Sequence, residues 1–318
     1  MNIGFIFTTG FFYSIIRITT PILFATLAAV IGEKGGVSNI GLEGIMMLSA
    51  LFGSVTAAAS GSWAAGVAAA LLIGILTSLL MGFFAFNLRT DIILTGTAVN
   101  MIGSGGCLFL CNILTEKISG SGQASTTALI VQKLQIPSWK IPGLSSIPVI
   151  GQIFSGHCIL TYLAFLFVWF TWILLYKTPL GLNIRSVGEN PNAASSVGVS
   201  VLRIKYITIG FTGLLAGFGG AFMSMYYSMG WSQDMVAGRG FIALAAQAMG
   251  GGEPAGSMLA ALVFGFAQAL GIKVSSKGAD SNLVSTMPYL VTIAGLVVFA
   301  LIARSREKKR HSSSVLKE

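Results

Sequence analysis

Long apolar runs alternate with short polar segments along almost the whole chain, a pattern typical of a protein that crosses a membrane several times. A helix needs about 20 mostly apolar residues to span the hydrocarbon layer. By this measure about nine apolar runs, one of them short, enter the membrane. They cover residues 11–31, 45–59, 63–86, 92–114, 158–176, 206–229, 241–249, 257–272 and 283–302. We therefore expect an all-α, polytopic transmembrane helical bundle.

Two glycine-rich segments interrupt this pattern at matching places. Residues 33–44 follow the first predicted span, and residues 230–240 follow the sixth. These segments fall on opposite sides of the membrane, so the sequence predicts two inverted halves with broken helices. Paired interruptions of this kind point to the substrate path of a transporter. Because glycine is abundant throughout the chain, a chance match is the alternative.

The composition supports a single membrane domain. Of 318 residues, 54% are hydrophobic and only 9% are charged, whereas about a quarter of the residues in a soluble domain are charged. We expect one transmembrane domain over residues 1–303 and a basic tail over residues 304–318. Cys107, Cys111 and Cys158 lie in apolar runs without metal-ligand spacing, so we expect no metal site and no cofactor.

Basic residues predict the orientation of the domain. Lys and Arg gather in the polar segment 177–205 and in the tail, and they outnumber those on the other side of the predicted spans. The positive-inside rule places both segments, and with them the C-terminus, in the cytoplasm. The loop 116–156 is then external, and the protein is a multi-pass protein of the plasma membrane in contact with the lipid bilayer. The net charge of +9 does not indicate nucleic-acid binding, because the basic residues do not share one face.

The polar segment contains the signals of one short helix over residues 191–197. Asn190 suits the N-cap, Pro191 suits the first helical position, and Gly198 suits a left-handed stop. Such a short helix has no core of its own, so it lies on the lipid surface or docks into a partner. A surface helix needs bulky apolar anchors and a basic face. This helix has neither, which favours docking.

Three stretches carry a family resemblance: GLNIRSVGENPNAASSVGVSVLRIKY, GEKGGVSNIGLEGIMMLSALFG and GRGFIALAAQAMGGGEPAGSMLAALVFGFAQAL. Together with the span pattern, they resemble permease subunits of bacterial ABC importers, in the branch of simple-sugar and nucleoside permeases. NIGLEG and GRGFIALAA are most similar to nucleoside permeases. The resemblance implies import of nucleosides, purine nucleosides among them. Riboflavin or a simple sugar is the alternative within the class.

The resemblance also implies partners and a coupling site. The partners are two cytoplasmic ATPase subunits, a second and paralogous permease subunit, and an extracytoplasmic substrate-binding lipoprotein. In this family the first of the three stretches docks on the ATPase. The positions that match the family pattern, with Glu189 as a charged neighbour, are Gly181, Arg185, Gly188, Glu189, Asn190, Pro191, Ala193, Ala194 and Gly198.

The motifs of enzymes are missing from the sequence. No G-x-x-x-x-G-K-[ST] occurs, so ATP hydrolysis is expected in a separate subunit, and neither HExxH nor GxSxG occurs. We therefore predict a transport subunit rather than an enzyme. A passive channel or facilitator is the rival class, but it has no use for a capped docking helix.

Strongly polar side chains inside or at the ends of the predicted spans are the candidates for the substrate path. Glu43 is a carboxylate at membrane depth, and Asn39 would share its face on a helix. The alternative is that Glu43 caps the second span at the cytoplasmic surface. Asn100 and Gln247 are further candidates, each with a structural interhelical hydrogen bond as its alternative. Phe241, at the start of the short seventh run, completes the predicted path.

Overall fold

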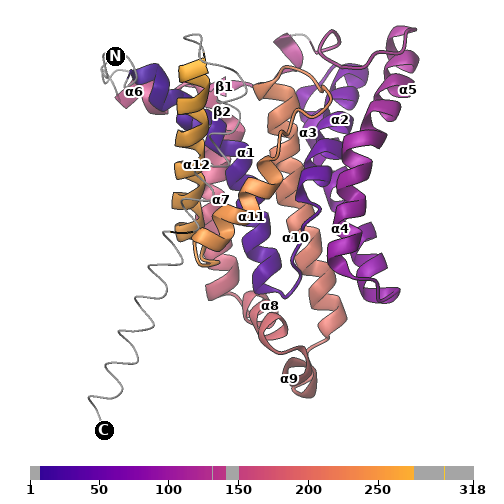
Figure 1. Cartoon of the computed structure of the whole chain (residues 1–318), viewed down its shortest axis with the longest axis vertical. Coiled ribbons are helices and arrows are strands. Elements are labelled where there is room, and N and C mark those ends of the chain that lie inside the picture. Colours follow the sequence, from indigo (N-terminus) through magenta and orange to yellow (C-terminus); the bar gives the residue numbers. More distant parts are fainter. Residues whose placement is uncertain (1–7, 131, 141–149, 276–296, 298–318) are drawn as a thin grey trace.

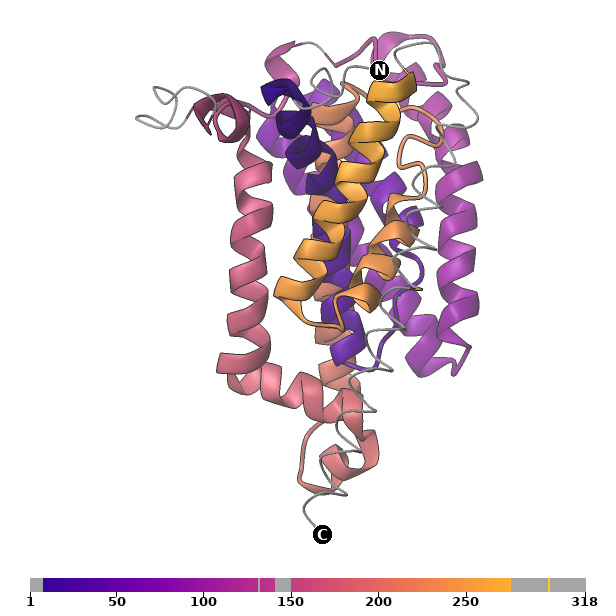
Figure 2. The same ribbon diagram turned by 60° about the vertical axis from the view of Figure 1, so that its left-hand side comes forward.

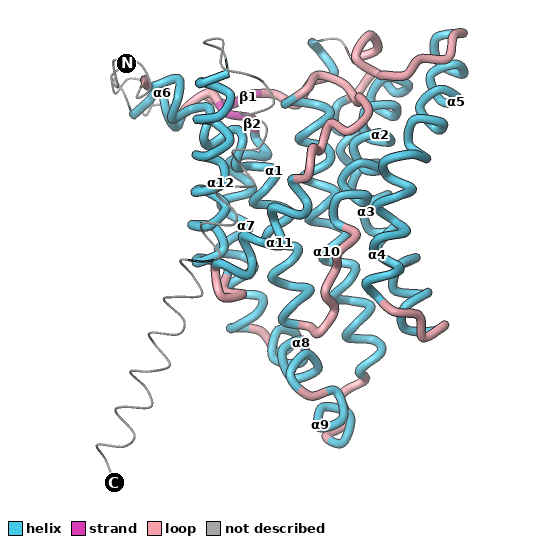
Figure 3. Tube along the Cα trace, in the orientation of Figure 1, coloured by secondary structure: helices cyan, strands magenta, loops and turns pink. Residues whose placement is uncertain are grey.

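The computed structural model describes residues 8–130, 132–140, 150–275 and 297. Within these residues the chain is a bundle of helices, with one pair of two-residue strands (Figures 1 and 3). The strands, β1 (Ser138–Trp139) and β2 (His157–Cys158), pair antiparallel. They lie with the short helix α6 (Ile150–Phe154) in the long loop that follows the fourth span.

Seven helical segments of the described chain are long and apolar enough to cross a membrane. Three of them continue through a short π-helical stretch, named η2, η3 or η6. The segments are α1 (Thr9–Lys34), α2 (Leu42–Ser60), α3 with η2 (Trp63–Gly82 and Phe83–Asn87), α4 with η3 and α5 (Ile92–Met101, Ile102–Gly106 and Cys107–Ser119), α7 (Ile159–Lys177), α10 with η6 (Val201–Phe222 and Met223–Tyr227) and α12 (Pro254–Ser275).

These segments confirm the polytopic helical bundle, and each matches one predicted span. The short run expected over 241–249 is the helix α11 (Arg239–Met249). With 11 residues, α11 rises only about 16 Å and cannot cross the bilayer alone. Apart from residue 297, the ninth predicted span and the basic tail lie outside the described residues.

The α1 helix forms the centre of the bundle. In its most apolar window 94% of the residues are buried, against 28% for the α3–η2 segment and 22% for the α4–α5 segment. It packs against α7, α10, α11 and α12, and α10 in turn packs against α2 and α3. The peripheral helices expose large apolar side chains, as expected of surfaces that face lipid or another membrane subunit.

Both predicted interruptions are present, and they enter the bundle from opposite ends (Figures 1 and 2). Residues 35–41 turn back from the end of α1, and α2 then begins midway along the bundle. Residues 228–238 turn back from the end of η6, and α11 also begins inside the bundle. The first turns of α2 and α11 therefore come together in the interior.

One end of the bundle carries the polar segment as two helices rather than one (Figure 2). The predicted short helix is α9 (Pro191–Ser196), which lies at the extreme end. Before it, α8 (Pro179–Glu189) runs across the end of the bundle, a helix that the sequence analysis did not predict. Thr178 caps α8 by accepting a hydrogen bond from the backbone of Gly181. We refer below to this side of the bundle as the α8 end.

Candidate functional site

The first turns of the two broken helices meet at one carboxylate, Glu43. Its Oε1 atom accepts a hydrogen bond from the backbone N–H of Gly238 at 2.8 Å, and Oε2 accepts one from Gly240 at 2.6 Å. The first N–H groups of a helix have no partner within the helix, and the N-terminal end carries partial positive charge. A carboxylate inside the bundle needs such donors. Glu43, itself in the first turn of α2, thus accepts hydrogen bonds from the free N–H groups at the N-terminus of α11.

Close backbone packing holds this junction together. A methyl group on Gly240 would lie 2.7 Å from the Cα atom of Glu43, so only glycine allows this approach. On the other side of α2, Asn100 accepts a hydrogen bond from the backbone N–H of Gly44 at 2.8 Å. The same side chain donates to the carbonyl of Ile40 at 3.0 Å. The start of α2 is therefore clamped between α4 and α11.

A cavity of about 420 Å³ opens beside the Glu43 junction, within the usual size range of small-molecule pockets. It brings together three of the predicted path residues, Glu43, Asn100 and Phe241. The remaining lining residues are Met101, Ser104, Asp234, Ala237 and Gly238. Asp234 and Ala237 adopt left-handed backbone angles, with φ of 57° and 49°. Strained backbone of this kind gathers at functional sites.

The other two predicted path residues lie away from this cavity. Asn39 is buried, donates to the hydroxyl of Thr212 at 2.8 Å and accepts from the backbone of Gly41 at 3.0 Å. It precedes the helix, because α2 begins only at Leu42, so the expectation that Asn39 and Glu43 share a helix face was wrong. Gln247 is near the far end of α11 and lines a different cavity at the α8 end.

That second cavity has a volume of about 710 Å³ and contains a compact polar cluster. Glu253, the residue before α12, pairs with Lys34 at 2.9 Å and accepts a hydrogen bond of 2.6 Å from the Tyr176 hydroxyl. The Arg185 guanidinium stacks over the Tyr176 ring, 4.8 Å from its centroid. Burial tends to raise the pKa of Glu253, but its bonds to Tyr176 and Lys34 and the charges of Lys34 and Arg185 hold that pKa below its usual value.

The predicted coupling positions lie along α8 and α9. Asn190 caps α9 as expected, since its Oδ1 atom accepts from the backbone N–H groups of Asn192 and Ala193, each at 3.1 Å. Ala193 is exposed, whereas Ala194 is buried against the chain's own helices, and Gly198 has a φ of +87°.

The glycines of α8 attach the same segment to the bundle. Gly181 packs against the end of α7. A methyl group on Gly188 would lie 2.9 Å from the backbone nitrogen of Gly36, so α8 touches the start of the loop that leads into α2. Pro191 begins α9, and Glu189 ends α8 and lines the 710 Å³ cavity.

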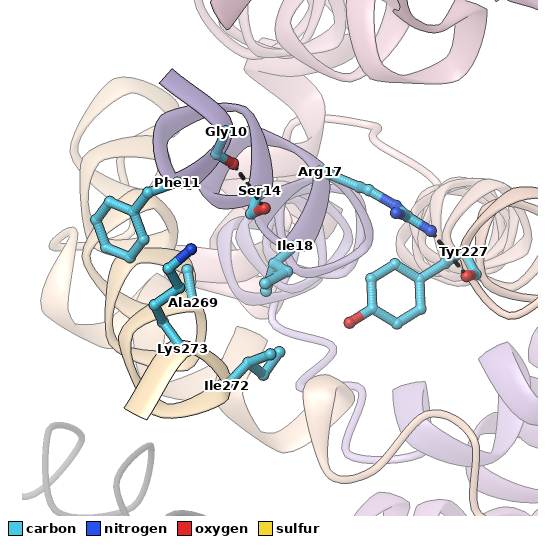
Figure 4. Close-up of a pocket in the computed structure, with 9 residues that line it drawn as sticks. All are labelled: Gly10, Phe11, Ser14, Arg17, Ile18, Tyr227, Ala269, Ile272 and Lys273. Carbon is cyan, nitrogen blue, oxygen red and sulfur yellow. Dashed lines mark hydrogen bonds between the residues drawn. The ribbon is translucent and has the colours of Figure 1, made fainter. Parts of the chain in front are cut away.

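A third cavity, of about 400 Å³, lies between α1 and α12 (Figure 4). Arg17 donates to the carbonyl of Tyr227 at 3.0 Å, and Lys273 reaches the cavity from α12. None of the predicted site residues lines it. The charged residues that line these three cavities and that the sequence analysis did not assign to a site are Arg17, Glu33, Lys34, Asp234, Glu253 and Lys273.

The comparison with known proteins agrees with this architecture. A family model described as "Branched-chain amino acid transport system / permease component" matches residues 11–303. The guanosine ABC transporter permease protein NupQ of Bacillus subtilis is 36% identical over 88% of both chains. The nucleoside ABC transporter permease protein NupC of Lactococcus lactis is 36% identical over 88% of this chain and 89% of its own.

A putative glucose ABC transporter permease protein of Haloferax volcanii, TsgC13, is 30% identical over 91% of each chain. No solved structure shows significant similarity to this chain. ATP hydrolysis in such transporters takes place in a separate subunit. The chain thus belongs to the permease-component family of ABC transporters, as a membrane subunit that spans the bilayer with a bundle of unbroken and broken helices.

Proposed function

We propose that this chain is the permease subunit of an ABC importer for nucleosides and that the Glu43 cavity is its part of the substrate path. The observation that carries the proposal is the carboxylate held between the first turns of α2 and α11, beside a cavity of about 420 Å³. Broken helices whose ends meet inside the membrane are typical of transporter binding sites. The names of NupQ and NupC support nucleosides, whereas TsgC13, at lower identity, supports a sugar.

The lining of the cavity suits a nucleoside. The carboxylate of Glu43, the amide of Asn100 and the hydroxyl of Ser104 offer hydrogen bonds to ribose hydroxyls and base nitrogens. The Phe241 ring and Met101 offer apolar surface to a flat base, and Phe241 is 49% exposed. A sugar would use the polar groups but not the aromatic ring in the same way.

A second permease subunit would complete this cavity. Ser104 and Asn112 are exposed on the α4–α5 segment, which is the least buried of the candidate spans. Polar side chains directed at lipid are costly, so a face that carries them is expected to meet protein or an aqueous path. We therefore place a paralogous permease against α4 and α5, with the substrate path between the two subunits.

The α8 end would face the cytoplasm and receive the ATPase. Val197, directly after α9, exposes 78% of its surface, and Ala193 beside it is small and exposed. An apolar tip on a capped helix suits insertion into a cleft of a partner. Arg185, Glu189 and Pro191 belong to the same segment. The extracytoplasmic binding lipoprotein would then dock at the opposite end of the bundle. The basic tail would lie in the cytoplasm.

The test is uptake by the complete complex in proteoliposomes, with labelled guanosine, cytidine, riboflavin, ribose and glucose compared side by side. We expect ATP-dependent uptake of nucleosides only. Asn190→Ala, which removes the cap at a cost of about 1 kcal/mol to α9, should reduce uptake without preventing membrane insertion. Uptake without ATPase subunits would instead show a facilitator. Preferential uptake of glucose or riboflavin would contradict the nucleoside assignment.

A further inference from the structure

We infer that Glu253 is the positioning residue that connects the ATPase-docking segment to α11, and through α11 to the Glu43 cavity. This inference rests on the proposed function, since it requires that an ATPase moves α8 and α9. Glu253 does not touch the cavity beside Glu43. It acts at the other end of α11, and four contacts carry the argument.

The first contact joins α8 to α7. Arg185 extends from α8 over the ring of Tyr176, which lies in the last turn of α7. A guanidinium over an aromatic face is attractive and orients both groups. A displacement of α8 therefore changes the position of Tyr176, or breaks the stacking contact.

The second and third contacts join α7 and α1 to the turn between α11 and α12. The Tyr176 hydroxyl lies 2.6 Å from both carboxylate oxygens of Glu253, and the Lys34 amine lies 2.9 Å from Oε1. Lys34 is the last residue of α1, directly before the loop that leads to α2. One carboxylate thus gathers the ends of α1 and α7 at the start of α12.

The fourth connection is the turn itself, which is tied to the two helices beside it. The backbone N–H of Gly252 donates to the carbonyl of Gln247 at 3.0 Å, and that of Ser257 donates to the carbonyl of Glu253 at 2.8 Å. A pull on the Glu253 carboxylate is therefore transmitted to α11 rather than absorbed by a loose loop. The other end of α11, its N-terminus, lies about 16 Å away and carries the backbone groups that bind Glu43.

A direct route reaches the other broken helix. Gly188 of α8 touches Gly36 at the start of the segment that leads into α2. The docking segment thus contacts the approach to α2 directly, and it reaches the far end of α11 through the Glu253 cluster. The two routes differ in chemistry, because the Gly188 contact is backbone packing and the Glu253 contact is a polar cluster. Side-chain substitutions at Glu253 can therefore interrupt one route and leave the other intact.

The experiment uses the complete transporter in nanodiscs and proteoliposomes, with Glu253→Gln, Lys34→Gln and the exchanged pair Lys34→Glu with Glu253→Lys. Solute imported per ATP hydrolysed should fall about fivefold or more in each single variant, within the usual range of coupling between distant sites. ATP hydrolysis itself should continue. The exchanged pair restores opposite charges but places a lysine near Arg185, so it should recover part of the ratio. Glu116→Gln, in the last turn of α5 at the opposite end, is the matched control.

A second readout does not depend on the substrate. Phe241→Cys places a thiol on the cavity side of α11, while the three native thiols are buried. We expect ATP to change the rate at which a membrane-impermeant maleimide modifies this thiol, and Glu253→Gln to abolish the change. If wild-type complex imports no nucleoside, the proposed function fails, and the maleimide rate still decides the role of Glu253.

Three results would overturn the inference. The first is a wild-type ratio of imported solute to hydrolysed ATP in Glu253→Gln. The second is an exchanged pair whose ratio is no higher than that of the single variants. The third is a maleimide rate that ATP does not change in Phe241→Cys with native Glu253. If Glu253→Gln does not fold, Lys34→Gln takes its place, because it removes the same ion pair from the other side.

Discussion

Glu43 and Glu253 are two carboxylates that stand at helix starts, and their surroundings differ. Glu43 lies inside the bundle, where its oxygens accept hydrogen bonds from two backbone N–H groups of α11. Glu253 lies at the α8 end, half exposed, and binds the side chains of Lys34 and Tyr176. Backbone donors inside a packed junction are fixed in place and little screened by solvent while the junction is closed. Side-chain donors at a wet surface can rearrange, so the first contact suits stability and the second suits a joint that moves.

The largest expected effect is that of Glu43→Ala. Two hydrogen bonds to a charged acceptor are lost, each contributing about 1.5–3 kcal/mol, so the free energy of unfolding should fall by about 3 kcal/mol or more. Denaturant titration of the purified permease in detergent measures this change, and uptake should be abolished. Glu43→Gln keeps one carbonyl acceptor and should lose less. A fully stable Glu43→Ala protein would show that α11 is held by other contacts.

Gly240→Ala tests the same junction by volume rather than charge. The added methyl group would press on the backbone of Glu43, which should lower the free energy of unfolding by about 1–3 kcal/mol. Gly210→Ala is the matched control, because that methyl group would meet only the end of the Leu79 side chain at 3.9 Å. The same denaturant titration compares the two. Equal stability of both variants would contradict the close packing of α11 on α2.

Glu253→Ala should have a smaller effect on stability than either change at the junction. A half-exposed ion pair contributes about 0–1 kcal/mol, so the unfolding curve should move little. Glu253→Ala should nevertheless lower import per ATP, because it removes the carboxylate that connects α8 to α11. A loss of stability as large as that of Glu43→Ala would mean that Glu253 is structural.

The smallest expected effect is that of pH on the Glu253 cluster. The pKa of Glu253 is lower in the folded protein than in the unfolded chain. The stabilising contribution of this carboxylate is therefore complete above the unfolded pKa of about 4.3, and it is lost as pH falls through the lowered folded pKa. Import per ATP should therefore be insensitive to this group between about pH 5 and 8. A pH series comparing wild type with Glu253→Gln checks this. A difference between them that appears only above pH 6 would contradict the low pKa.

The same two regions show how far the sequence predicts the structure. Apolar run length predicts the spans, because a bilayer imposes a length that each segment must meet by itself. Local chemistry also predicts α9, since Asn190 and Pro191 carry their own capping signal. The sequence analysis missed α8 because the surrounding segment is polar, as in a loop. The apolar face of α8, with Ile184 and Val187, packs on the bundle. Thr178 and Pro179 were the available signal.

The candidate site was predicted only in part, for a related reason. Glu43 was recognised as unusual, but its partner Gly240 lies 197 positions further along the chain, and no local pattern connects them. Asn39 was grouped with Glu43 on a helix that begins three residues too late to include it. Asp234 and Ser104 reach the cavity only through tertiary packing. The residue type identifies a carboxylate that is costly to bury, but only the fold shows which donors form hydrogen bonds with it.

The shared carboxylate has a consequence for how a solute would be held and released. While α2 and α11 touch, the oxygens of Glu43 are occupied by the protein's own amides. Any parting of the two helices frees an anion and two amide donors at once, within one small space. A guest with both hydroxyl donors and ring acceptors satisfies all of them, and re-closure expels it by restoring the original bonds. On the proposed substrate path, the protein's backbone would thus be the competitor that the transported molecule displaces.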